Sequence, residues 1–434
     1  MSIFASMDTA ILGINAQAAA IGHISDNVAN ASTNGYRQVS TAFSDLVTNK
    51  LMGASPVTDN TRNMGVLALA DFNNRKNGQI IHDDSLTSIA VNGNGFIPVE
   101  RATGFSTTDH TPSGFDSQVY YTRLGDFHMD NSNRLVNSAG YYLMATTVGG
   151  TTPSDFVVDT DDIAAVPASV VNYTLNLPSS ALVGRTITNG IGIVDATGVE
   201  RQFQVQWQKT AADTWSMTVN TPDATPASFG PVSVTFANGV LSTMTSTDPN
   251  ITVTAAGNAV ATLSPDFGSG AQAITFNLGT FGGAFSTANT SGLTQFATND
   301  ANESNFSITQ NGLKTGAFQN VSIQEDGEIV YNYSNGRTQV GGQILLANFP
   351  EPDRLNRLDG TVFTETSVSG DVVYGVPGGS NGTGLLVSSA VEQSNVDVAE
   401  QMTHLISAQQ AYGLNSQVLT ASNEMLSRLI DMKR

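Results

Sequence analysis

The chain has 434 residues, enough for roughly three domains, and a formal net charge of −19 although only 13% of its residues are charged. This acidic balance argues against binding to nucleic acid or to an anionic membrane, because both need a basic patch. The absence of cysteine excludes disulfides and zinc–thiolate sites, and without an apolar run of about 18 residues or a basic-then-apolar leader we expect neither membrane insertion nor a cleaved secretory signal.

The first predicted element is a long amphipathic helix at the amino terminus. Apolar or small residues recur alternately every four and three positions, which is the spacing of a coiled-coil seam. These residues are Met7, Ile11, Ile14, Ala18, Ile21, Ser25 and Val28. Gly13 and Gly22 each cost roughly 0.5–1 kcal/mol in a helix interior, which close approach of another helix could offset. Such a helix cannot bury itself alone, so it should pair with the other end of the chain or with neighbouring copies.

A polar turn follows this helix. Asparagines that can cap free carbonyls lead into Asn34-Gly35, which is a turn signal. The helix exit and turn include Asn27, Ala29, Asn30, Thr33, Gly35 and Tyr36.

From residue 71 onward, short strands dominate the pattern. We expect strands at 79–81, 89–91 and 93–99, then at 120–127 and 135–143, with a turn at 129–133 between the last two. Residues 35–70 before them are polar and rich in turn signals, which favours a connector.

The midpoint of the chain predicts a second set of strands. One segment alternates apolar residues with glutamines: Phe203, Val205 and Trp207. After a polar turn, a second segment shows the same alternation, with Trp215, Met217 and Val219 as its apolar residues. This is the pattern of a half-buried antiparallel hairpin. The same alternation recurs at 232–236, which ends at Asn238-Gly239, and at 274–278.

A second long helix is predicted over residues 394–430. Apolar residues occupy six consecutive heptad positions, with two more at partner positions: Val391, Val398, Leu405, Tyr412, Leu419 and Leu426, then Met402 and Ile430. Ser394 and Asp397 form a capping-box-like start. No charged residue lies between Gln401 and Asn423, whereas a solvated helix face normally carries charge. We therefore expect other protein to surround this helix, and Gly413 to be tolerated for the same reason as Gly13. Glu392, just before it, is expected to be dispensable for assembly.

Both ends of the chain resemble the bacterial flagellar axial proteins, the family of rod, hook and hook-junction subunits. The turn at residues 27–36 matches the amino-terminal signature of that family. Ser394–Asp397, Ala408–Tyr412 and Glu424–Leu426 match its carboxyl-terminal motifs. The resemblance covers roughly residues 1–147 and 315–434, and it fades between them.

The resemblance and the strand pattern together predict a multidomain fold, with long terminal α-helices forming a coiled-coil-like domain and two nested all-β domains. Residues 1–34 and 392–434 would form the terminal helical assembly domain. Residues 35–70 and 376–391 would form the connector, and 71–147 with 308–375 the inner β domain. Residues 148–307 would form an outer β domain inserted in the inner one.

No catalytic or cofactor site emerges from the sequence. Gly378-Gly379-Ser380-Asn381-Gly382 matches the nucleophile-elbow pattern, but that motif needs a preceding strand and a following helix. The neighbouring Pro377, Thr383 and Gly384 favour a loop instead. The histidines show no metal-ligand spacing, so we expect no enzyme activity, metal or cofactor.

Three functions compete at this point. The midpoint insertion favours a hook subunit over a distal rod subunit, and hook–filament junction subunits match the β-domain motifs less well. A secreted β-domain adhesin that oligomerises through its helical ends is the third possibility. For a hook subunit the resemblance implies an extracellular, hollow, bendable polymer that carries motor torque. It also implies export by the flagellar type III apparatus without a cleaved signal, and contacts with the hook cap, the distal rod and the hook–filament junction proteins.

Overall fold

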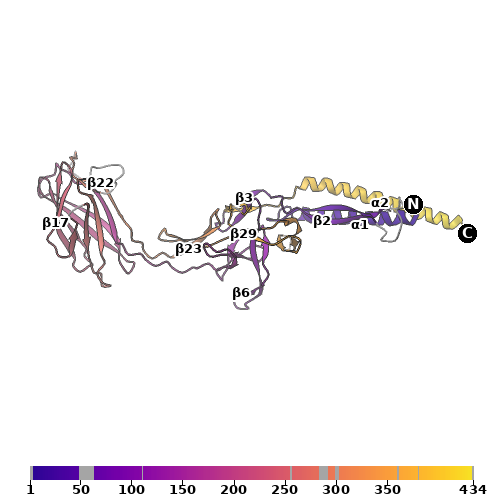
Figure 1. The fold of residues 1–434 in the computed structure, drawn as a ribbon, viewed down its shortest axis with the longest axis horizontal. Helices are drawn as coiled ribbons and strands as arrows, with labels where there is room; N and C mark the ends of the chain where they lie inside the picture. The colour runs from indigo at the N-terminus through magenta and orange to yellow at the C-terminus, as the bar shows by residue number, and fades with distance from the viewer. Residues whose placement is uncertain are drawn as a thin grey trace, which may run out of the picture. The chain divides into compact units, whose positions relative to one another are not determined.

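The computed structural model describes residues 3–47, 63–109, 111–254, 257–282, 292–298, 303–358, 361–379 and 381–432. Within these ranges it contains two long helices and a series of β-sheets (Figure 1). The chain divides into two compact units. Unit 1 comprises Met1–Thr160, Asn320–Asn332 and Thr338–Arg434, and unit 2 comprises Asp161–Gln319 and Tyr333–Arg337. The finer domain boundaries predicted above stay predictions.

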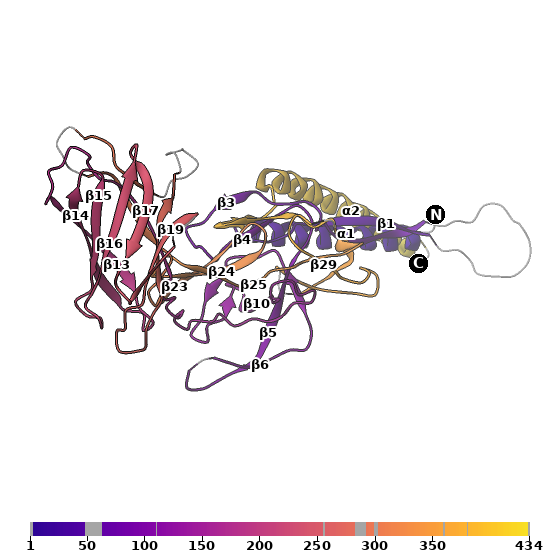
Figure 2. The same ribbon diagram turned by 60° about the vertical axis from the view of Figure 1, so that its left-hand side comes forward.

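The two ends of the chain form an antiparallel helix pair in unit 1. Helix α1 spans Ile3–Ala29 and helix α2 spans Val398–Met432. Asn27 near the end of α1 meets Gln401 near the start of α2, and Gly13 meets Asn415 further along. The two helices lie side by side in both views (Figures 1 and 2). The predicted pairing of the terminal helices is confirmed.

Helix α2 begins four residues later than predicted. The carboxylate of Asp397 accepts hydrogen bonds from the backbone N–H groups of Ala399 (2.9 Å) and Glu400 (3.2 Å), so Asp397 is the N-cap. The Ser394 hydroxyl instead accepts from the N–H of Val396, in the extended segment before the helix. The prediction that the helix starts at Ser394 is wrong because an aspartate closer to the first turn takes the cap.

A β-hairpin lies along α1. Strands β1 (Val39–Val47) and β2 (Asn63–Phe72) pair antiparallel, with Val39 opposite Phe72. Gly65 on β2 approaches the Leu12 side chain so closely that an added Cβ would lie 2.7 Å from Leu12 Cδ1. These strands fall in the 35–70 segment that the sequence presents as a connector; residues 48–62 of that segment lie outside the described ranges.

The β region of unit 1 is built around a nine-stranded sheet with the order β27-β28-β7-β5-β10-β9-β8, onto which β6 and β11 add at β5 and β10. Its strands are β5 (Ile97–Phe105), β6 (Pro112–Phe115), β7 (Tyr120–Thr122), β8 (His128–Met129), β9 (Leu135–Val136), β10 (Tyr141–Ala145), β11 (Ser154–Asp155), β27 (Asn356–Arg357) and β28 (Val362–Thr364). Phe96, Tyr121, Phe349, Leu355 and Phe363 form a buried apolar cluster against it.

Smaller sheets complete this region. They are the pairs β3 (Ile80–His82) with β31 (Ala390–Glu392), β4 (Ile89–Asn92) with β30 (Leu385–Ser388), and β26 (Leu346–Asn348) with β29 (Val373–Gly375). A three-stranded sheet contains β23 (Phe318–Ile323), β24 (Glu328–Tyr333) and β25 (Thr338–Gln343), and the short 3-10 helix η1 spans Pro352–Arg354. Through β3 and β31, the segment that precedes α2 is paired with the start of the inner β region.

The prediction of a single strand over residues 135–143 is wrong, because the structure divides this segment into two strands, β9 and β10. Asn137 and Gly140 close a turn between them: the Gly140 N–H donates to the Asn137 carbonyl at 2.9 Å, and Gly140 has φ +80°. A left-handed glycine ends the first strand and reverses the chain. Similarly, residues 123–127, expected to continue a strand, lie outside β7.

Unit 2 is an all-β structure with one eleven-stranded sheet system, ordered β13-β14-β15-β16-β17-β21-β12-β20-β19-β18, with β22 on β12. Its strands are β12 (Val170–Asn176), β13 (Thr186–Val194), β14 (Glu200–Ala211), β15 (Thr214–Asn220), β16 (Ser228–Ala237), β17 (Val240–Ser246), β18 (Ile251–Val253), β19 (Asn258–Leu263), β20 (Ile274–Thr280), β21 (Leu293–Thr294) and β22 (Ser304–Gln310). A large apolar core includes both tryptophans, each fully buried.

The predicted midpoint hairpin is confirmed in its register. Strands β14 and β15 pair with Val205 opposite Val219 and Trp207 opposite Met217, and all four side chains point into the core. The next hairpin turns at Asn238-Gly239, where φ is +54° and +84°. Positive φ at both central residues is the geometry of the tight turn that Asn-Gly favours.

Candidate assembly interface

The buried side chains of the two paired helices are mostly small or polar. On α1 the buried positions are Ala10, Gly13, Ala16, Ala20, Ile24 and Asn27. On α2 they are Gln401, Ala408 and Ser422. A Cβ at Gly13 would lie 2.8 Å from Asn415 Nδ2, so the absence of a side chain at Gly13 permits the close approach that the sequence predicted there. No atom lies within 4 Å of the corresponding positions at Gly22 and Gly413, so close approach of a helix at those two would have to come from another copy and stays a prediction.

The predicted seam residues lie outside this contact or at its edge. Ile11, Val398, Met402, Tyr412 and Ile430 are exposed. Met7, Ile14, Ile21, Val28, Leu405, Leu419 and Leu426 are half-buried. None of them is fully buried in the chain by itself, so their role as an interface between chains stays a prediction.

Asn27 of the signature turn joins three elements. Its Nδ2 donates to the Val39 carbonyl at 2.8 Å and to Gln401 Oε1 at 3.0 Å, while its Oδ1 accepts from the Val39 N–H at 2.9 Å and from the Tyr36 hydroxyl at 3.2 Å. The side chain is 1% exposed. All four hydrogen-bonding positions of this amide are therefore used to hold α1, β1 and α2 together.

The other signature residues shape the turn. Asn30 Nδ2 donates to the Asp26 carbonyl in the last turn of α1, and the Thr33 hydroxyl donates to Asn30 Oδ1. Burial raises the pKa of Tyr36, whose ring carries the Arg357 guanidinium at 4.2 Å. Ala29 is the last residue of the helix.

Gly35 sits where only glycine fits. Its φ is +70°, and an added Cβ would lie 2.7 Å from the backbone nitrogen of Leu124. Its N–H donates to the Glu392 carbonyl at 2.7 Å. The turn therefore packs directly against both the inner β region and the segment that leads into α2.

A buried cluster of charges lies beside this turn. Glu392 Oε1 is 2.8 Å from Arg37 Nη2, and Glu392 Oε2 is 3.2 Å from Arg123 Nη1; all three side chains are at most 2% exposed. The Gly78 N–H also donates to Glu392. Burial lowers the pKa of Arg37 and lowers that of Arg123 to about 9, so Arg123 is still cationic at neutral pH. The carboxylate of Glu392 therefore balances two buried guanidinium groups that are distant in sequence. That Glu392 is dispensable for assembly stays a prediction, but within the single chain it is a structural residue.

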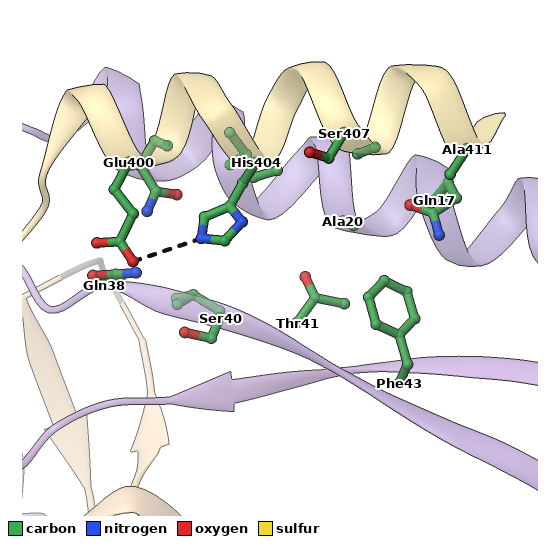
Figure 3. A pocket seen from close by; sticks show the side chains of 14 residues that line it. Gln17, Ala20, Gln38, Ser40, Thr41, Phe43, Glu400, His404, Ser407 and Ala411 are labelled. Atoms are coloured by element: carbon green, nitrogen blue, oxygen red, sulfur yellow. Dashed lines mark ion pairs between the residues drawn. The ribbon is translucent and has the colours of Figure 1, made fainter. Parts of the chain in front are cut away.

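A groove opens between α1, β1 and α2 (Figure 3). It has a volume of about 480 Å³. Residues of the two helices form one side, including Gln17, Ala20, His404 and Ala411. Gln38, just before β1, and the β1 residues Ser40, Thr41 and Phe43 form the other. An ion pair of 3.6 Å joins Glu400 and His404 one turn apart on α2, at the edge of the groove.

In the part of the chain that the structure describes, no group of three or more His, Asp or Glu side chains could hold a metal ion. No described helix is long and apolar enough to cross a membrane. Ser380, in the motif that matches a nucleophile elbow, lies outside the described residues; the preceding Pro377–Gly379 form a turn without a helix after it.

Comparison with known proteins identifies the family. A family model described as the flagellar hook protein FlgE/F/G D1 domain matches residues 90–179, and one described as the flagellar basal body rod FlgEFG protein C-terminal matches residues 387–432. The chain is 32% identical to the flagellar hook protein FlgE of Brucella abortus biovar 1 (strain 9-941), over 100% of both chains. It is 26% identical to that of Escherichia coli (strain K12), over 98% of this chain and 99% of the other.

The crystal structure of the Helicobacter pylori flagellar hook protein FlgE2 aligns at a TM-score of 0.43 and 12% identity, covering 72% of this chain and 100% of that one. The sequence alignments run through the midpoint strands, where motif comparison alone showed no resemblance. These alignments confirm that the chain is a hook subunit and not a rod subunit, a hook–filament junction subunit or an adhesin. They also confirm that it is a structural protein and not an enzyme. This chain belongs to the flagellar hook protein FlgE family and is a structural subunit of the hook, an extracellular part of the flagellum.

Proposed function

We propose that the protein polymerises with copies of itself into a hollow, bendable helical tube that transmits motor torque to the filament. Helices α1 and α2 form the assembly domain in this proposal. The hook cap, the distal rod, the hook–filament junction proteins and the flagellar type III export apparatus are its other partners. Identical subunits that meet through two different surfaces which do not close a ring form an open helical polymer.

The observation that carries this proposal is the uncovered surface of α2. Beyond its contact with α1, the helix exposes a stripe of large apolar side chains that we call the outer stripe: Ile406, Leu414, Val418, Met425, Leu429 and Met432. These residues recur mostly at intervals of three, four, seven and eight, so they share one side of the helix. The first three of these residues also lie in the stretch from Gln401 to Asn423, which has no charged residue, so this part of the helix is suited to contact with protein and not with water.

A charge on the outer stripe tests the proposal. Leu414 is 64% exposed, so Leu414→Asp should leave the melting temperature of the monomer unchanged. In a polymer the same carboxylate would be buried without a partner, at an effective cost of several kcal/mol. We expect the critical concentration for polymerisation, measured by sedimentation, to rise by roughly two orders of magnitude.

Leu182→Asp is the matched control. Leu182 is 83% exposed and lies in unit 2, so this variant should polymerise nearly as the unmodified protein does. Normal polymerisation of the Leu414→Asp variant would exclude α2 as the assembly surface. Failure of the unmodified protein to polymerise at any concentration would contradict the proposal as a whole.

A further inference from the structure

Residues 154–160, the last of unit 1 before the chain first enters unit 2, form a segment that we call the strap. The strap is held to the turn between β8 and β9: the Val158 N–H donates to the Asn133 carbonyl at 2.8 Å, and Arg134 forms an ion pair with Asp155. Its strand β11 is two residues long and pairs with the end of β10. A segment with so few bonds opens more readily than the sheet beneath it.

A buried carboxylic acid lies near the strap. Glu100 on β5 is 5% exposed, and its Oε1 has no hydrogen-bond partner among the described residues. Tyr142 of β10 lies opposite Glu100, and the Phe115 ring of β6 packs edge-on against Tyr142, with 5.2 Å between the ring centroids. The Arg134 guanidinium lies over the same Phe115 ring at 4.8 Å. One cation therefore stands near both the buried carboxyl group and the strap.

The other titratable groups on this face of β5 leave Arg134 as the cation that acts on Glu100. Burial raises the pKa of Glu100 to about 7, and the positive charge of Arg134 opposes this shift. The Asp130 carboxylate accepts the backbone N–H of Arg134 at 2.9 Å and is used within the turn. Burial raises the pKa of Tyr142, so its phenol is neutral at physiological pH.

Arg134 has two carboxyl groups to choose between, and they differ in exposure. The side chain of Asp155 is 41% exposed, so water can solvate its charge if Arg134 leaves. Ionised Glu100 has no such solvation, and a buried charge without a counter-charge costs far more than the loss of an exposed ion pair. Protonated Glu100 makes no such demand. Arg134 should therefore stay with Asp155 while Glu100 is neutral and turn to Glu100 when it ionises.

We propose that Glu100 and Arg134 form a pH-sensitive latch for the strap: Arg134 holds Asp155 while Glu100 is protonated, and it releases Asp155 when Glu100 ionises. Since the pKa of Glu100 is raised to about 7 in the folded chain, the strap is closed below this pH and loosens as the pH rises through it. The latch lies within unit 1 of one subunit, so it does not depend on polymerisation.

Hydrogen exchange of the full-length monomer tests the latch. The probe is the Val158 amide, whose protection factor is corrected for the intrinsic effect of pH on exchange. It should fall about fivefold between pH 6 and pH 8.5, the loss expected for an ion pair with one exposed partner. Glu100→Gln should match the unmodified protein at pH 6 and show no fall. Asp155→Asn should show the lower protection at both pH values.

Asp116→Asn is the matched control. Successive side chains of a strand point to opposite faces, so Arg101 lies on the face of β5 away from Glu100. There Arg101 is 3.7 Å from Asp116 and lies over the Tyr120 ring at 5.7 Å. The Asp116→Asn variant removes one carboxylate, as Glu100→Gln does, but should keep the full pH response of Val158.

Three results would overturn the latch. Protection of Val158 that does not change with pH in the unmodified protein would show that the strap stays closed. A fall that persists in Glu100→Gln would mean that another group titrates. A fall that persists in Asp155→Asn would show that the response comes from the stability of unit 1 as a whole and not from the ion pair on the strap.

Discussion

Glu100, on β5, is a carboxylic acid that the fold buries without a hydrogen-bond partner for its Oε1 among the described residues. It is 5% exposed. Burial raises its pKa from 4.5 to about 7, and the nearby positive charge of Arg134 offsets only part of this effect. The folded protein therefore keeps a proton on Glu100 at a pH where the unfolded chain has lost it.

The stability of unit 1 should depend on this proton. The contribution of Glu100 is fully present below about pH 4.5 and is lost as the pH rises through 7, because the buried group must then ionise. The Glu100→Gln variant, which cannot ionise, should match the unmodified protein at pH 4 and be more stable by about 3 kcal/mol at pH 8. Urea unfolding at both pH values measures this difference. Glu325→Gln, at an exposed site, should show no such gain; an equal stability of Glu100→Gln and the unmodified protein at pH 8 would refute the argument.

Two glycines in the amino-terminal region should respond oppositely to the same substitution. Gly35→Ala would place a Cβ 2.7 Å from the Leu124 backbone at φ +70°, so we expect the monomer to lose several kcal/mol of stability. Gly22→Ala puts a methyl group into open space on an exposed helix position and should raise the stability by about 0.5–1 kcal/mol. Thermal unfolding of both variants as monomers measures the effects. A neutral result for Gly35→Ala would mean that the backbone at Leu124 moves freely.

At the scale of elements, the sequence predicted that two long helices exist at the chain ends and pair with each other, but not which faces meet. Seven-residue spacing identifies large apolar side chains, and it selected Ile11 and Tyr412, which are exposed. The helices meet instead through Gly13, Ala20 and Ala408, since close approach requires small side chains. In a helical segment without charged residues, such as Gln401–Asn423, charge cannot distinguish the two faces. The β14–β15 register was predictable because strict alternation leaves only one way to bury its aromatic side chains.

The junction before α2 was not predictable, because its partners are far apart in the sequence. Glu392 contacts Arg37 and Arg123, which lie far earlier in the chain, and no local sequence pattern marks ion pairs across such a separation. Gly35 was recognisable as a turn residue, but not as the point where the Leu124 backbone approaches it. Local sequence signals predicted the turn and the residue types that form it. The contacts that require those particular residues are made with distant parts of the chain.

This junction should be sensitive to loss of its single carboxylate. Glu392→Ala leaves two guanidinium groups buried without a counter-charge, for which we expect a loss of about 3–5 kcal/mol in stability. Glu351→Ala is the control: it removes an ion pair with Arg75 in which both side chains are more than half exposed, and such pairs contribute at most about 1 kcal/mol. Thermal unfolding distinguishes the two. Comparable melting temperatures for both variants would show that the buried cluster does not hold the junction.

At the scale of the whole molecule, the chain enters and leaves unit 2 through two segments that run side by side. The Ile163 N–H donates to the Gly316 carbonyl at 2.9 Å, and the Gly316 N–H donates back to the Ile163 carbonyl at 3.1 Å. A second bridge joins Val166 and Leu313. The two ends of the midpoint insertion are therefore adjacent, and unit 2 has an apolar core of its own. Such an arrangement is typical of a domain inserted into another without disturbing it.

Excision of the insertion should leave unit 1 folded. In the proposed variant, Ile163 is joined to Gly316 by a short Gly/Ser link, because paired backbone positions need only a tight turn to connect them. Unit 1 keeps its buried cluster around Phe96 and Phe363, so calorimetry should show its melting transition near the temperature found in the full chain. The excised segment, expressed separately, should retain the second transition, since both tryptophans are buried in its core. The shortened protein should also still polymerise through α1 and α2. An unfolded shortened protein, or a single transition in the full chain that neither fragment reproduces, would show that the two units fold only together.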